Sequence, residues 1–321
     1  GKIIEIKNMF SIENGIVKEP ALGELIKELI DPYETYDSQN RKDNYYGGIV
    51  YSNYVYEENQ STQTFKLVPL FISEAFKKKI NKLAPKRVYM SATVINHENM
   101  IEDLGMEKDK TKYIELQSKI PKESRPIFSV PVAKLSMKET DDVIENSEEF
   151  KNLCDKIVDI LSAHESEGES GFIYCNSYRL SNLIYKGIVG RTGYEILINS
   201  NTGETKEVLN RFLDTSKKNR LLISCSFAEG VNFNDDISRF QIIPKIPYLF
   251  LGSKRIALKN KLNNRWYTNK AIEQIIQVAG RSVRSPQDNA VTYILDSAFS
   301  WCYKKYEQDY PTWFTEAINR L

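Results

Sequence analysis

The stretch Gln277-Val-Ala-Gly-Arg-Ser-Val-Arg284 closes a segment, residues 268–283, whose residue spacing predicts a helix. Each helical residue turns the chain by about 100°, so Gln277, Arg281 and Arg284, spaced by four and three, are expected on one face. Another face carries apolar residues at the spacing of a core face: Ile272, Ile276, Ala279 and Val283. The pattern predicts a buried apolar stripe with two guanidinium groups opposite it, and such groups suit phosphate oxygens.

These eight residues alone would favour an ordinary solvated helix face, but two other features favour a functional site. Gly280 lets another group approach the helix closely, at a cost of about 1 kcal/mol in a helix interior. Upstream, Phe227-Ala-Glu-Gly-Val-Asn-Phe-Asn-Asp-Asp236 follows the apolar run Leu221–Ser226, which has the pattern of a buried strand. This polar segment after a buried strand, together with the two arginines, favours a functional site over a solvated helix face.

Composition limits the possible classes of protein. The 321 residues suffice for two modest domains or one large one, and 41% hydrophobic with 27% charged residues are typical of a globular protein. The net charge of +1 excludes a strongly basic nucleic-acid coat, so nucleic-acid binding would need a local groove. The four cysteines form no CxxC pair, and no metal site is predicted. We expect an intracellular protein without disulfides, because no signal peptide or membrane-spanning run is found.

Strands alternate with helices through most of the chain. Predicted strands cover residues 171–175, 194–198, 221–226, 240–243 and 291–295, and predicted helices cover residues 148–163, 180–188, 204–213 and 268–283. This alternation predicts an α/β fold whose mostly parallel sheet is covered by helices on both faces. The aromatic segment 299–314 is expected to form a helix that packs Trp301, Tyr306 and Trp313 onto the domain.

The first part of the chain is harder to interpret. A helix is predicted over residues 21–30, two strands over 46–56 and 61–69, a helix over 72–83 and a short strand over 87–90. Ser91-Ala-Thr93 follows that strand, where small and hydroxyl residues either form a turn or helix cap or lie at a ligand site. Residues 119–131 contain three prolines, so we place a domain boundary between residues 118 and 119.

Taken in order, these blocks resemble the C-terminal half of superfamily 2 helicases, most closely the DinG/XPD family. The resemblance covers about residues 46–299. It rests on five blocks in the family's order, each weak alone: Val88-Tyr-Met-Ser-Ala-Thr93 with Leu104-Gly105, Ser118–Pro126, Gly171-Phe-Ile-Tyr-Cys-Asn-Ser-Tyr178, Glu229–Asp236 with Lys245-Ile-Pro-Tyr248, and Gln277–Arg284 with Asp288 and Leu295-Asp296. The chain departs from the family at Asn232, where Asp is usual, and at Ala290, where Gly is usual.

The resemblance implies a RecA-like motor domain 2 over residues 119–321. Residues 1–118 would be the tail of motor domain 1, with or without part of an inserted arch region. The sequence contains no GxxxxGK[ST] loop and no DEAH-type box, the elements that hold the phosphates of ATP and Mg²⁺. We therefore expect a helicase cut after its second motif. ATP and Mg²⁺ would bind mainly to motor domain 1 upstream, and the chain alone would bind no cofactor and be inactive.

In the family, arginines of motor domain 2 neutralise charge on the γ-phosphoryl group of ATP, a contribution of about 10³ to 10⁵ in rate. By resemblance, Arg281 and Arg284 take this role and Gln277 bonds near the same phosphate. The resemblance carries further roles onto matching positions: nucleotide binding or coupling onto Glu229, Gly230, Asp236 and Gly280, single-stranded DNA binding onto Ser177 and Tyr178, and domain coupling onto Ser91, Ala92 and Thr93. A tyrosine that merely fills space is the competing interpretation for Tyr178.

Two functions from different classes remain. The first is part of an ATP-dependent DNA helicase or translocase, with 5′-to-3′ polarity by resemblance, that is monomeric, nucleoid-associated and active only with motor domain 1 of the same polypeptide. The second is a non-catalytic RecA-like module that binds nucleic acid or a protein. The missing phosphate loop fits both. Gln277, Arg281 and Arg284 together favour the helicase, because a scaffold has no use for arginines that act across a domain interface.

Overall fold

The computed structural model describes residues 12–13, 16–17, 54–59, 64–91, 93–199, 205–227 and 230–320. Its chain divides into two compact units. The first contains the described parts of Gly1–Met90 together with Asn96–Tyr113 and Phe250–Tyr267, and the second contains Ser91–Ile95, Ile114–Leu249 and Thr268–Leu321. The helix predicted over residues 21–30 lies outside the described residues. The assignment of residues 1–118 and 119–321 to two motor domains stays a prediction.

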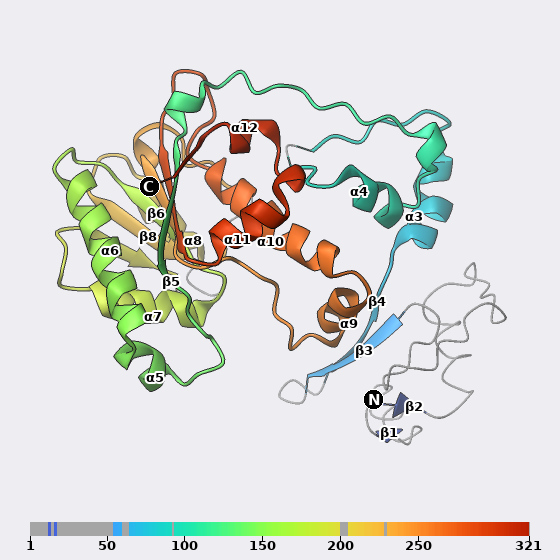
Figure 1. Cartoon of the computed structure of the whole chain (residues 1–321), viewed down its shortest axis with the longest axis horizontal. Coiled ribbons are helices and arrows are strands. Elements are labelled where there is room, and N and C mark those ends of the chain that lie inside the picture. Colours follow the sequence, from blue (N-terminus) through green and yellow to red (C-terminus); the bar gives the residue numbers. More distant parts are fainter. Residues whose placement is uncertain are drawn as a thin grey trace. The chain divides into compact units, whose positions relative to one another are not determined.

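A parallel sheet of seven strands forms the core of the second unit (Figure 1). Its strands are β5 (Ile127–Ala133), β6 (Gly171–Tyr174), β7 (Glu195–Ile198), β8 (Arg220–Ser224), β9 (Phe240–Ile243), β10 (Val291–Asp296) and β11 (Ile318–Arg320). The spatial order is β11-β5-β10-β9-β6-β8-β7, and every neighbouring pair is parallel. The predicted α/β fold with a mostly parallel sheet is confirmed.

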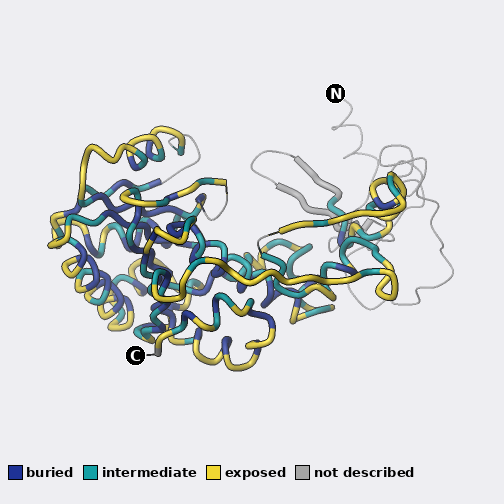
Figure 2. The backbone as a smooth tube through the Cα atoms, turned by 90° about the horizontal axis from the view of Figure 1, so that it is seen from above, coloured by how far each residue is buried: buried dark blue, intermediate teal, exposed yellow. Residues whose placement is uncertain are grey.

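Helices cover both faces of this sheet. One face carries α5 (Asp141–Asn146), α6 (Glu148–Glu165) and α7 (Tyr178–Ile188), and the other carries α8 (Thr205–Leu213), α10 (Asn264–Ala279), α11 (Phe299–Lys305) and α12 (Thr312–Thr315). Successive strand residues point to opposite faces, so Phe172 and Ile173 of β6 join different core clusters. Figure 2 shows the buried residues following the strands of this sheet.

The central strands are buried along their whole length. Every residue of β6, β8 and β9 is buried, as expected for parallel strands covered on both faces. Gly171, at the start of β6, has no room for a side chain, because an added Cβ would lie 2.2 Å from the ring of Phe240 on the neighbouring strand. That ring in turn stacks on His164, with ring centroids 4.2 Å apart. The glycine is therefore required by close packing between strands.

The sequence pattern predicts neither β5 nor β11. Residues 119–131 were expected to separate two domains, yet β5 begins at Ile127 and runs through Pro131 between β11 and β10. Pro131 has no N–H to donate to a neighbouring strand. The pairing of β10 with β5 shifts its register between Ile294 and Asp296, and such irregularities are where a sheet tolerates proline.

The first unit contains a hairpin and short helices. Strands β3 (Tyr54–Asn59) and β4 (Thr64–Pro69) pair antiparallel from Tyr54–Pro69 to Asn59–Thr64, which confirms the two predicted strands where the structure describes them. The remaining elements of this unit are the two-residue strands β1 (Ile12–Glu13) and β2 (Ile16–Val17), helices α3 (Ser73–Lys79), α4 (His97–Asp103) and α9 (Lys254–Leu262), and the 3₁₀ turns Asn81–Leu83 and Lys108–Lys110.

The strand predicted over residues 87–90 is wrong. Val88 and Met90 are 83% and 89% exposed, and no strand of the described chain pairs with this segment. An extended segment becomes a strand only when a neighbour satisfies its backbone hydrogen bonds. The apolar pattern alone is therefore insufficient here.

The C-terminal segment only partly follows its prediction. Tyr306 is buried and Trp313 packs against the core, as expected, but Trp301 is 59% exposed. Phe299, Cys302 and Tyr303 occupy the core side of α11, so Trp301 faces outward. The Lys305 ammonium lies 4.8 Å from the centroid of the Trp301 ring, a cation–π arrangement on the protein surface.

We expect Gly171→Ala to lower the free energy of unfolding by about 1–3 kcal/mol, because it overpacks a close contact with a buried ring. Urea denaturation measures this change. Gly280→Ala is the matched control, since a Cβ there would meet the carbonyl oxygens of Ile276 at 3.5 Å and Gln277 at 3.8 Å, both ordinary contacts. The control should change stability by no more than about 0.5 kcal/mol. Equal stabilities of the two variants would contradict the packing argument.

Candidate nucleotide and nucleic-acid site

Helix α10 ends at Ala279, so the prediction of a helix through residue 283 is wrong. Gly280, Arg281 and Arg284 instead lie in the α10–β10 loop (residues 280–290), and they do not share a helix face with Gln277. The cause is the buried amide of Gln241 on β9. Its Nε2 donates to the carbonyl of Ala279 at 2.9 Å, and its Oε1 accepts from the Ser282 hydroxyl at 2.8 Å. These bonds satisfy the last helical carbonyl and hold the chain as it leaves the helix.

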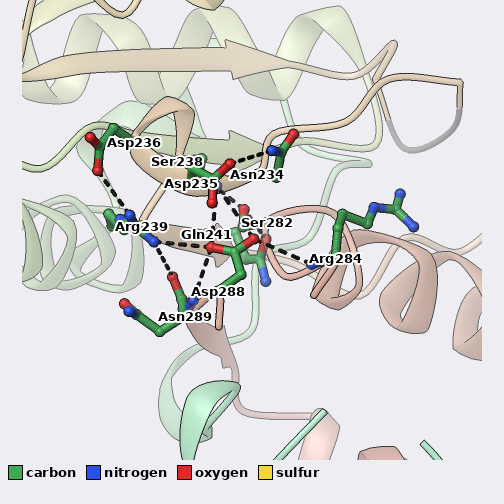
Figure 3. Close-up of polar contacts among 10 residues, drawn as sticks. All are labelled: Asn234, Asp235, Asp236, Ser238, Arg239, Gln241, Ser282, Arg284, Asp288 and Asn289. Carbon is green, nitrogen blue, oxygen red and sulfur yellow. Dashed lines mark hydrogen bonds and ion pairs between the residues drawn. The ribbon is translucent and has the colours of Figure 1, made fainter. Parts of the chain in front are cut away.

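The two arginines predicted to act together have different surroundings. Arg281 is only 7% exposed, and its Nη1 donates to the carbonyl of Val231 at 2.5 Å. Its own carbonyl accepts from the amide of Phe233 at 3.2 Å. Arg281 therefore joins the α10–β10 loop to the β8–β9 loop (residues 225–227 and 230–239). Arg284 is exposed, and its side chain points away from the contacts between the loops (Figure 3).

The two loops also meet at Asp288, which is 2% exposed. Its carboxylate accepts hydrogen bonds from the main-chain amides of Asp235 (3.2 Å), Arg284 (3.3 Å) and Asn289 (2.9 Å), and from Nη1 of Arg239 (3.0 Å). Nη2 of Arg239 donates to the exposed carboxylate of Asp236 at 2.8 Å. Figure 3 shows Asp288 at the centre of this set. Asp236, predicted to link nucleotide state to DNA, thus lies at the exposed end of an ion-pair chain.

Two other predicted residues, both glycines, are less constrained. Gly230 is exposed and left-handed, with φ of 80°, a conformation that glycine adopts without a steric cost. Gly280 follows the last residue of α10, and no side chain of the described residues approaches its missing Cβ closely. Its expected close approach to a ligand stays a prediction. Glu229 and Ala92 lie outside the described residues.

The structure brings the predicted coupling motif to Gln277. Within the second unit, Nε2 of Gln277 donates to Oγ1 of Thr93 at 3.4 Å, and the Thr93 amide donates to Oγ of Ser91 at 3.2 Å. Oε1 of Gln277 is buried and has no hydrogen-bond partner among the residues that the structure describes. A buried acceptor without a donor costs about 1–3 kcal/mol. The amide therefore has an unused polar atom at the position where sequence analysis expects a phosphate nearby.

Ser177 and Tyr178 follow β6 and begin α7. The hydroxyl of Ser177 accepts from the amide of Leu180 at 3.2 Å and so caps the helix, which accounts for a serine here without any ligand. The hydroxyl of Tyr178 lies 3.2 Å from that of Ser226, just after β8. Both predicted DNA-binding residues are partly exposed, so each side chain has an internal partner and a solvent-facing part.

Sequence analysis missed a further polar residue at this edge of the sheet. Asn199 follows β7 and is buried, and its Nδ2 donates to the hydroxyls of Ser226 at 3.1 Å and Thr205 at 3.2 Å. The carboxyl ends of β6, β8 and β7, which are neighbours in the sheet, thereby share one polar network. The available signal was a polar residue within two positions after an apolar strand: Asn176 after β6, Asn199 after β7 and Ser226 after β8.

The cysteines of these strands are not reactive groups. Burial raises the pKa of the Cys175 thiol to about 12 and also raises the pKa of Cys225. Both therefore stay protonated near neutral pH, as expected for core residues. Across the described part of the chain, no three His, Cys, Asp or Glu side chains are grouped so as to hold a metal ion. A search of the same residues finds no helix with the length and apolar character to cross a membrane.

We expect Arg281→Ala to lower the free energy of unfolding by about 1–3 kcal/mol, because it removes the hydrogen bond to Val231 and the packing of a buried side chain. Arg284→Ala, which truncates an exposed side chain, should stay within about 0.5 kcal/mol of wild type. Urea denaturation of both variants provides the comparison. Similar stabilities would show that Arg281 does not hold the two loops together.

Comparisons with known proteins place this geometry in a family. Residues 158–317 match the model of the helicase C-terminal domain. The ATP-dependent DNA helicase CHL1 of Candida albicans is 29% identical over 119 residues, 30% of this chain and 14% of that protein. CHL1 of Debaryomyces hansenii is 23% identical over 213 residues, 56% of this chain and 26% of that protein. The chain thus spans about a quarter or less of the length of these relatives.

Solved structures show the same fold. The structure named XPD_APO superposes on 84% of this chain and 55% of its own, with a TM-score of 0.59 and 16% identity. The structure named XPD_Helicase covers 84% of this chain and 48% of its own, with a TM-score of 0.53 and 14% identity. The parallel sheet of the second unit is therefore RecA-like, and the chain carries the C-terminal region of a superfamily 2 helicase of the DinG/XPD family.

Proposed function

We propose that this region is the second motor domain of an ATP-dependent DNA helicase or translocase. A separate nucleotide-binding motor domain, carried by the same polypeptide, would supply the phosphate cradle and Mg²⁺. The observation that carries the proposal is the pairing of a fixed main chain with an exposed guanidinium at Arg284. An arginine that acts across a domain interface needs both, because its charge must be positioned before the reaction rather than during it.

In the proposed reaction, Arg284 neutralises charge that develops on the γ-phosphoryl group as it is transferred to water. The planar guanidinium fork can donate two parallel hydrogen bonds to phosphate oxygens. Arg281 is assigned a different role. Its bond to Val231 holds the loop that bears Arg284 in place.

Gln277 has a specific part in this proposal. A phosphate oxygen accepts hydrogen bonds, so the Gln277 amide must present its Nε2 to a nucleotide. Rotating the amide by half a turn does this, because the Thr93 hydroxyl can then donate to Oε1 instead of accepting from Nε2. The contact with Thr93 is kept and the unused polar atom becomes a donor. The Thr93 hydroxyl would then change from acceptor to donor when the amide rotates.

The carboxyl ends of β6, β8 and β7 are the proposed contact for single-stranded DNA. Tyr178 can stack on a base, and the hydroxyls of Ser226 and Thr205 can bond phosphate oxygens. The β8–β9 loop starts beside Ser226 and ends at Asp235 and Asp236, next to the loop that bears Arg284. It therefore offers a path between the DNA and nucleotide sites. Movement in the 5′-to-3′ direction is proposed from the family resemblance alone.

We expect Arg284→Ala, in the polypeptide that joins this region to its nucleotide-binding domain, to lower kcat by about 10³-fold or more. Oligonucleotide affinity and melting temperature should stay near wild type, because the side chain is exposed. Arg284→Lys should recover little, since an ammonium lacks the planar fork. Steady-state ATPase measurements with saturating single-stranded DNA give the comparison.

Arg191→Ala serves as the matched control for this experiment. Arg191 is a surface arginine paired with Asp155 at 2.5 Å, and its loss should leave turnover unchanged. The chain without the nucleotide-binding domain should show no ATP turnover. Normal turnover by Arg284→Ala would contradict the catalytic role proposed for Arg284. Turnover by the isolated chain would contradict the proposal that the nucleotide-binding domain supplies the phosphate cradle and Mg²⁺.

We expect the chain itself to bind single-stranded DNA weakly, with an affinity that falls as the salt concentration rises. The net charge of +1 leaves few phosphate contacts, and each lowers the logarithm of affinity by about 0.7 per tenfold rise in salt. Tyr178→Ala should weaken binding by about 1–3 kcal/mol if a base stacks there. Tyr178→Phe, which keeps the ring, should not. Fluorescence anisotropy at two salt concentrations tests this, and salt-independent binding would contradict it.

A further inference from the structure

Asp288 links two loops through one carboxylate. Oδ2 accepts from the main-chain amides of both Arg284 and Asp235, each at 3.3 Å. Oδ1 accepts from the amide of Asn289 and from Nη1 of Arg239, and it lies 3.2 Å from the Asp235 amide as well. A carboxylate has about four acceptor positions, and these contacts fill them. Arg284 and Asp235, far apart in sequence, therefore share a single oxygen atom.

The surroundings show that this carboxylate must hold its partners firmly. A buried charge is costly unless it is paired and hydrogen-bonded, and Arg239 provides the pairing at 3.0 Å. Asp235 has a φ of 55°, a left-handed conformation that residues other than glycine adopt only when their surroundings fix them. Its amide, held by Asp288, is one of the groups that fix it. Releasing Asp288 would therefore free the conformation of Asp235.

Two contacts between the loops flank Arg284 along the chain. On its N-terminal side, Arg281 bonds Val231 and Phe233, and on its C-terminal side, Asp288 bonds Asp235. The amide of Arg284 itself belongs to the second contact. A ligand that draws Arg284 toward it must therefore move the β8–β9 loop or break the bond to Asp288.

We propose that Asp288 is a positioning residue that couples Arg284 to the β8–β9 loop. Through this bond, a phosphate group held by Arg284 would change the affinity of the carboxyl ends of β6, β8 and β7 for single-stranded DNA. This inference rests on the proposed function, because it needs a nucleotide at Arg284 and DNA at the strand ends. Asp288 touches neither ligand and acts through the main chain of two loops.

Asp288→Asn tests the coupling with little change in shape. The asparagine side chain has no charge. Its NH₂ group is a hydrogen-bond donor, and it replaces a carboxylate oxygen that accepted hydrogen bonds from two main-chain N–H groups. The measurement is the affinity for an oligo(dT) strand, with and without a non-hydrolysable ATP analogue, in the polypeptide that carries both motor domains. We expect the ratio of the two affinities to fall about tenfold, toward one, within the range typical of coupling between sites. Affinity without the analogue should change by less than about twofold.

A double-variant cycle separates coupling from simple damage. If Asp288 acts through Arg284, then Asp288→Asn should not alter the ratio further in an Arg284→Ala background. In the chain itself, hydrogen exchange at the amides of Asp235 and Arg284 should quicken. Asp296→Asn is the matched control, because Asp296 is equally buried and accepts from the amides of Ile246 and Ala298 at 2.9 Å each. For Asp296→Asn, the ratio of the oligo(dT) affinities with and without the ATP analogue should equal that of wild type.

Arg239→Lys provides a second variant should Asp288→Asn fail to fold. It keeps a positive charge but cannot span Asp288 and Asp236 with one fork, so it should also lower the ratio. A folded Asp288→Asn or Arg239→Lys protein with the wild-type ratio would overturn this inference and leave the proposed function intact. A wild-type protein whose DNA affinity ignores the ATP analogue would overturn both.

Discussion

One buried amide, that of Gln241 on β9, determines where the candidate site lies. Its Nε2 donates to the carbonyl of Ala279 and to the hydroxyl of Thr292 on β10, and its Oε1 accepts from Ser282. A fully satisfied polar network in a core is costly to rearrange, because breaking one bond leaves the others without partners. Helix α10 must therefore end at this point, and the chain that follows becomes the α10–β10 loop. The position of Arg284 depends on that ending.

Sequence periodicity predicts the elements of the sheet but not the end of α10. The central strands are mostly apolar, and every residue of β6, β8 and β9 is buried, Gln241 included, as expected for parallel strands covered on both faces. The apolar spacing of the helix continues to Val283, although the helix ends at Ala279. The bond that ends it comes from Gln241, about 40 residues away, and no local pattern contains it. Strand β5 was missed for a similar reason, since its one proline, Pro131, is tolerated only because of an irregular pairing with β10.

The candidate site shows the same limit at the level of single residues. The motif pattern gives Arg281 and Arg284 one common role, and nothing in their spacing separates them. Burial separates them, because Arg281 lies among loop backbone groups and Arg284 faces solvent. In the same way, Asp288 was noted as part of the fifth block, but its four donors come from segments whose proximity only the fold creates. The hydrogen bond between Asn199 and Ser226 likewise could not be predicted from the sequence, because it depends on β7 and β8 being neighbours in the sheet.

A carboxylate suits the junction of the two loops better than an apolar contact would. Apolar contacts are non-directional, so they hold two segments together without fixing which backbone groups face each other. Asp288 accepts from three main-chain amides and one guanidinium, and each bond specifies a position. Hydrogen bonds to a charged acceptor are worth more than neutral ones, yet each can lengthen or break separately as a loop shifts. The junction is thus specific in the arrangement observed, and the proposed coupling between two ligand sites requires that it can also pass to a second one.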